Sequence, residues 1–131
     1  MDKKIEKHFE HDKELLSILN EIENMTTITP KKFYDYKSLV KKRLSTIRIH
    51  RLECDEYVKA YLDYCENKDN FYKLTIITST TYNFIGINKN TTIKEALKGG
   101  IKKASERIAL YKHIDKYLDR VNSKLDSLIK K

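Results

Sequence analysis

The chain has 131 residues and a net charge of +8, with 40% hydrophobic and 35% charged residues, one proline, three glycines and two cysteines. This length suits a single helical domain over residues 1–131, and the shortage of turn residues and cysteines excludes a β-sandwich, a disulfide framework and a four-cysteine zinc site. No stretch has the apolar length of a signal peptide or a membrane span. We therefore expect a soluble cytoplasmic protein that has no membrane partner.

The first predicted element is an amphipathic helix over residues 3–24. Its apolar residues recur at spacings of three, four and seven, which is the pattern of a helix with one buried face. A polar stretch follows, and it ends at Thr29 and Pro30. Thr29 is well placed to cap the next helix, because proline is favoured in a first helical turn.

The second predicted element is a long helix over residues 31–66. Its apolar residues, from Phe33 to Cys65, continue the same spacing and form an apolar seam, in which Arg51 fills one position. A helix of this length spans roughly 50 Å. The polar run at 66–70 predicts its end.

Residues 71–87 permit two interpretations. Their many β-branched and aromatic residues favour strands. The alternative pattern is one face of a helix, formed by Phe71, Leu74, Thr78, Tyr82 and Ile85. Strict alternation is absent, and no two-residue glycine turn divides the segment. We expect a helix here, and the alternative is an extended segment or a short hairpin.

The last predicted element is a helix over residues 92–130. Thr92 and Glu95 form a capping box, in which each side chain bonds the other's backbone N–H. Gly99 and Gly100 lie inside the helical pattern. They should weaken or bend the helix, since each glycine costs about 1 kcal/mol relative to alanine.

The apolar seam of this last helix resembles that of a coiled coil. It includes Ile108 and Leu118, alternates spacings of three and four through much of its length, and is interrupted by Asp115. The part from 118 to 129 should project beyond the other helices, so we expect a protein partner or a homodimer there. The expected fold is all-α, a helical bundle of three long amphipathic helices plus the element at 71–87.

Positive charge is concentrated in two blocks of the chain. Residues 31–52 carry eight basic residues against Asp35 alone, and residues 98–131 carry ten basic and four acidic residues. On helices these cations fall into two basic stripes, whereas a purely solubilising face normally mixes both signs. Phosphate backbones are the commonest partners of such stripes. The candidate nucleic-acid-binding residues are Lys37, Lys41, Lys42, Arg48, Arg51, Lys102, Lys112, Lys116, Arg120 and Lys124.

Some of the nine tyrosines lie off the apolar seams, and we expect them at the surface. An exposed tyrosine beside lysines can stack on a nucleobase, and the alternative role is a protein–protein contact. The off-seam tyrosines are Tyr34, Tyr57, Tyr64 and Tyr117.

The sequence favours no cofactor, metal or catalytic group. His8 and His11 are only two ligands and do not form a metal-binding motif. Both cysteines are expected to be reduced, unreactive thiols, because Cys54 and Cys65 occupy seam positions. We therefore expect a protein that is not an enzyme.

Two Arg–His pairs offer a more remote alternative. Arg43 precedes His50, and Arg107 precedes His113, with six and five residues between them. This spacing resembles that of the helical HEPN ribonucleases. The resemblance implies that arginine and histidine from one helix polarise a phosphate and assist attack by the RNA 2′-hydroxyl, commonly across a dimer interface.

The function we expect is non-enzymatic binding of nucleic acid, or of another polyanion, through the two basic stripes. The stripe on residues 31–66 should contribute more, because its block contains a single acid. The principal alternative is a protein-interaction module, such as a regulator, adaptor or inhibitor, that acts through helical surfaces.

Overall fold

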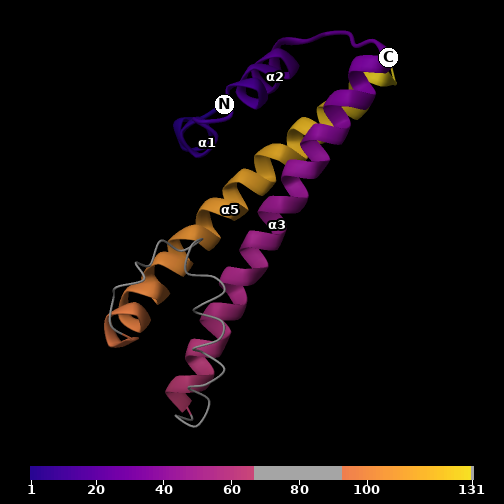
Figure 1. Ribbon diagram of the computed structural model, residues 1–131. Coiled ribbons are helices and arrows are strands. Elements are labelled where there is room, and N and C mark those ends of the chain that lie inside the picture. The colour runs from indigo at the N-terminus through magenta and orange to yellow at the C-terminus, as the bar shows by residue number, and fades with distance from the viewer. Residues whose placement is uncertain (67–92, 131) are drawn as a thin grey trace. The chain divides into compact units, whose positions relative to one another are not determined.

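The computed structural model describes the backbone of residues 1–66 and 93–130, together with the side chains of 1–62 and 100–130 (Figure 1). These residues are mostly helical and include no strand, as expected for an all-α protein. The segment 71–87 and the capping box at Thr92 lie outside the described residues. The helices are α1 (Lys3–His8), α2 (Lys13–Asn24), α3 (Pro30–Glu66) and α5 (Ile93–Ile129).

The two long helices were predicted correctly to within one residue at each end. α3 begins one residue before the predicted helix at 31–66, and α5 lies within the predicted helix at 92–130. Gly99 and Gly100 are both helical, so these glycines do not end α5. No helix within the described part of the chain is long and apolar enough to cross a membrane.

The prediction of one uninterrupted helix over 3–24 is wrong. α1 ends at His8, and the backbone N–H of the next residue, Phe9, bonds back to the Ile5 carbonyl; α2 begins after Asp12. The Asp12 carboxylate accepts a hydrogen bond of 3.2 Å from the Leu15 amide, which caps the new helix. Phe9, which lies at this break, is buried, with only 7% of its surface exposed.

The chain divides into two compact units, which are described separately. The first contains residues 1–47 and 113–131, and the second contains residues 48–112. α3 and α5 each contribute one part to each unit. That residues 1–131 form a single domain stays a prediction.

The core of the first unit is built from all four helices. In this unit the beginning of α3 lies beside the end of α5 (Figure 1), so that each covers apolar residues of the other. The buried residues include Ile5, Leu15, Leu19, Ile22, Val40, Leu44, Ile47, Ile114, Leu118, Val121, Leu125 and Leu128.

The seam on α5 differs from the prediction at Ile114 and at Ile108. Ile114 is fully buried and fills the position that Asp115 was expected to interrupt, whereas Ile108 is only half-buried. The three-and-four spacing therefore runs from Tyr111 through Ile114 to Leu118 without a break.

The expectation that the end of this seam lies uncovered is also wrong. Leu118, Val121, Leu125 and Leu128 are buried within the first unit, and only Ile129 is exposed, at 39%. The chain covers these residues itself. The seam therefore gives no reason to expect a homodimer or a protein partner along this helix.

The second unit buries the thiol of Cys54. Burial raises its pKa to about 11, and the neighbouring carboxylates of Asp55 and Glu53 act in the same direction. The thiol therefore stays protonated near neutral pH, where a thiolate would be the reactive form. Close by, the His50 ring lies 6.0 Å from the Tyr111 ring, measured between centroids.

Candidate nucleic-acid interface

The first basic stripe begins at a capped helix terminus. The Thr29 hydroxyl accepts a hydrogen bond of 3.3 Å from the Lys32 amide, and Pro30 occupies the first position of α3, as the sequence predicts. Within the first unit, α3 turns Val40, Leu44 and Ile47 toward the core. The opposite side of the helix is left facing solvent.

We call this solvent-facing side the outer face of α3. Five of its members, from Lys31 to Ser45, follow spacings of three and four residues and so form one row along the helix. Asp35 lies at the border of the row and is the only acidic residue in residues 31–47. The outer face consists of the exposed residues Lys31, Tyr34, Ser38, Lys41, Lys42 and Ser45.

Three other cations of α3 are paired with acids of the first unit. The Lys32 ammonium lies 3.0 Å from the Glu21 carboxylate, and Arg43 forms an ion pair with Asp12 at the cap of α2. The third is Lys37. These ion pairs join α3 to α2 and α5. The three cations are therefore engaged within the protein, although the sequence alone would place them on a basic surface.

Lys37, a predicted binding residue, is held inside the first unit. Its side chain is only 15% exposed and forms an ion pair with Asp126 of α5. The ammonium also lies 5.8 Å from the centre of the Phe33 ring. The hydrogen bond from Lys37 lowers the pKa of Asp126. Lys37 therefore belongs to the packing of α3 on α5, whereas Lys41 and Lys42 belong to the outer face.

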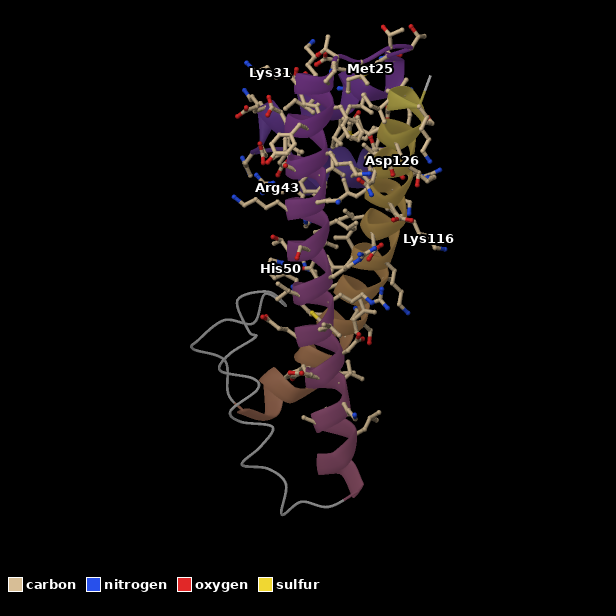
Figure 2. All side chains as sticks on the ribbon, turned by 90° about the vertical axis from the view of Figure 1, so that its right-hand side faces the viewer. Met25, Lys31, Arg43, His50, Lys116 and Asp126 are labelled. Atoms are coloured by element: carbon tan, nitrogen blue, oxygen red, sulfur yellow. The ribbon has the colours of Figure 1, made fainter. Side chains whose placement is uncertain are left out.

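The α5 stripe in the first unit is more mixed in charge. Lys116 and Arg120 are exposed, but the exposed Asp119 lies between them. Lys124 is half-buried and donates a hydrogen bond of 2.6 Å to the backbone carbonyl of Glu23. Figure 2 shows Lys31, a member of the row on α3, and Lys116 on opposite sides of the α3–α5 pair, so Lys116 does not extend the row.

The remaining predicted binding residues belong to the second unit. Arg48, Lys102 and Lys112 are exposed. The Arg51 guanidinium lies 3.9 Å from the carboxylate of Asp55, one helical turn further along α3. An exposed pair of this kind contributes little to stability.

The off-seam tyrosines behave differently from one another. Tyr34 is 72% exposed, as expected, but Tyr57 and Tyr117 are buried at 0% and 6%, so their expected exposure is wrong. The Tyr117 hydroxyl donates a hydrogen bond of 2.6 Å to the Glu23 carboxylate. The side chain of Tyr64 lies outside the described residues. Tyr34 is thus the described off-seam tyrosine that remains available to a ligand.

Glu23 also lines a concavity of about 330 Å³ in the first unit. Cations and acids both face this space, and the Glu23 carboxylate already accepts the Tyr117 hydroxyl. Burial raises the pKa of Glu23, but the hydrogen bond from Tyr117 and neighbouring positive charges outweigh it, so the net pKa is lowered. Charges of both signs therefore line the concavity, so it favours neither an anion nor a cation.

Acid is expected to destabilise the first unit. In the folded protein the pKa values of Glu21, Glu23 and Asp126 are all lowered. A carboxyl whose pKa is lower in the folded than in the unfolded chain stabilises the fold above its unfolded pKa, and this stability is lost as the pH falls through the folded pKa. The melting temperature should therefore decrease from about pH 5 to about pH 2.

Circular dichroism melts across this pH range check the expectation. A variant with Glu21→Gln and Glu23→Gln should be less stable than the natural chain at pH 7 and should lose less of its stability on acidification. Parallel melting profiles for the two proteins would contradict the assignment of these carboxylates.

The two Arg–His pairs are already engaged by acids. Arg43 pairs with Asp12, and His113 hydrogen-bonds to the Asp2 carboxylate. Each predicted pair therefore has one member held by a carboxylate, which competes with a phosphate for it. No cluster of three or more metal-binding side chains occurs among the residues with described positions.

Comparison of the chain with protein-family models, with curated proteins and with solved structures finds no match. The candidate binding residues chosen from the sequence did not include Lys31, Ser38 and Ser45, which the outer face contains. These three residues share a spacing of three and four with Tyr34 and Lys41, on the side of the helix opposite the apolar seam. This spacing is the sequence signal that could have identified them.

Proposed function

We propose that this protein binds nucleic acid, or a similar polyanion, through the outer face of α3 and catalyses no reaction there. One observation carries the proposal. The acids that approach α3 in the first unit pair with Lys32, Lys37 and Arg43. Lys31, Lys41 and Lys42 remain exposed on the outer face. A concentration of exposed cations without a direct ion pair on one helix face attracts phosphates.

Serine side chains between these lysines suit the same ligand. Ser38 and Ser45 are exposed in the same row, and hydroxyl groups commonly donate hydrogen bonds to phosphate oxygens. The cations on α5, including Lys116 and Arg120, contribute a secondary attraction, because Asp119 offsets part of their charge.

The arrangement of the helices supports a rigid interface. We infer that the helices of the first unit form a bundle, because ion pairs tie α3 to both neighbours, through Lys32 to α2 and through Lys37 to α5. A helix held in this way presents its outer side chains at defined positions. Such preorganisation reduces the entropy that binding costs.

A second candidate function is docking of another protein on α3. The second unit exposes Ile49, Leu52 and Leu62, at 54%, 61% and 57%. Exposed apolar residues of this size are typical of protein interfaces when they are contiguous. Binding of nucleic acid is preferred because the outer face in the first unit combines three cations with polar side chains.

Binding across a salt series tests the proposed function. Fluorescence anisotropy with a labelled generic duplex and a labelled single strand would be measured from about 50 mM to about 200 mM salt. Three phosphate contacts predict a slope of about −2 to −3 in log K against log salt. No binding at the lowest salt, or binding that is independent of salt, would contradict the proposal.

A further inference from the structure

Tyr34 is an aromatic side chain held in solvent. Of the exposed large hydrophobic residues in the described chain it has the greatest exposure, 72%. Other tyrosines of the first unit use their hydroxyls: Tyr36 bonds to Glu21 at 2.6 Å, and Tyr117 bonds to Glu23. Packing and internal hydrogen bonding therefore do not account for an aromatic residue at position 34.

The surroundings of Tyr34 are cationic and polar. Lys31 lies three residues before it and Ser38 four residues after it, so both are neighbours on the helix surface. Lys41 follows Ser38 in the same row, about 15 Å along the axis from Lys31. The outer face thus places one ring between two ammonium groups.

We propose that the outer face of α3 binds single-stranded nucleic acid, with one base stacked on the Tyr34 ring and the flanking phosphates held by Lys31 and Lys41. This inference rests on the proposed function and specifies its ligand. Aromatic side chains in a positively charged surface are how single-strand binders recognise bases without selecting sequence. A duplex offers no free base face to the ring, because its bases are already stacked on one another.

A single tryptophan reports directly on stacking. The chain contains no Trp, so Tyr34→Trp introduces a unique fluorophore at this position. Its fluorescence should be quenched by a single-stranded oligonucleotide and unchanged by an abasic strand of equal length and charge. A duplex should bind without comparable quenching.

Loss of the ring should weaken binding of the single strand selectively. Tyr34→Ala should reduce the affinity about 5-fold or more, whereas Tyr34→Phe should retain it, because stacking uses the ring and not the hydroxyl. Leu52→Ala is the matched control, since it shortens another exposed side chain of α3, 61% accessible, without removing a ring. Unchanged thermal melts would establish that all three variants fold.

Three outcomes separate the inference from the proposed function. Quenching by the single strand together with loss of affinity in Tyr34→Ala supports both. Equal, salt-dependent binding of the abasic strand, with no effect of Tyr34→Ala, overturns the stacking inference and leaves polyanion binding intact. Failure of every oligonucleotide to bind at low salt overturns both, and protein docking then becomes the function to pursue.

Discussion

Replacing Leu118 by aspartate is expected to unfold the first unit, with a loss of about 3 kcal/mol or more in the free energy of unfolding. Leu118 is fully buried on the α5 seam between Ile114 and Val121. The substitution removes apolar burial and places a carboxylate in the core of the first unit, where a charge without a partner is costly. Because small domains are stable by only about 5–15 kcal/mol, a thermal melt followed by circular dichroism will detect this loss.

A control on the same helix separates burial from charge. Ser123→Asp adds the same charge to the exposed side of α5, and surface changes of this kind usually alter stability by less than about 0.5 kcal/mol. A Leu118→Asp protein that melts like the natural chain would mean that the register of α5 is wrong.

Reversing the charge of Lys31, Lys41 and Lys42 together to glutamate should reduce the affinity for nucleic acid at least about tenfold at low salt, because each lost phosphate contact removes counterion release. All three side chains are exposed, so the melting temperature should change little. Fluorescence anisotropy with a labelled oligonucleotide measures the affinity.

The matched control reverses Lys3, Lys4 and Lys13, which are equally exposed on α1 and α2. Three Lys→Glu changes of two charge units each take the net charge from +8 to +2 in both proteins. Equal losses of affinity in the two variants would show that only net charge matters and that the outer face is not a site.

A third variant with Lys116→Glu and Arg120→Glu examines the α5 stripe. Loss of binding in this protein, with binding retained in the α3 variant, would place the interface on α5 instead. Lys37 is left unchanged in all variants. Its pair with Asp126 is part of the packing, and its reversal would confuse a loss of folding with a loss of binding.

The extents of the long helices and the charge of the site could be read directly from the sequence. Both depend on neighbours along the chain. Thr29 and Pro30 mark the start of α3 because capping acts within one helical turn, and the cations of residues 31–52 are adjacent in sequence. The outer face could also be derived in advance, since Lys31, Tyr34 and Lys41 follow helical spacing on the side opposite the apolar seam.

Burial and charge pairing depended on contacts that periodicity does not encode. The Lys37–Asp126 pair joins residues 89 apart in the sequence, and the Arg43–Asp12 pair joins residues 31 apart. Tyr117 lies beside the apolar seam of α5, where α2 packs on the helix. The Glu23 carboxylate of α2 accepts a hydrogen bond from the Tyr117 hydroxyl. Because α5 packs against both α2 and α3, it buries a wider face than its single apolar seam predicts.

Local order therefore follows from the sequence of this protein, whereas the availability of its charged groups follows from packing. Helix propensity, capping and apolar spacing act over a few residues, so the pattern alone yields α3 and α5 and a cationic α3. Whether a given lysine is free depends on which carboxylate the fold brings near it. Lys37 and Lys41 are four residues apart on one helix, yet Lys37 is 15% exposed and forms an ion pair with Asp126. Lys41 is exposed and acts on the same carboxylate only through its charge.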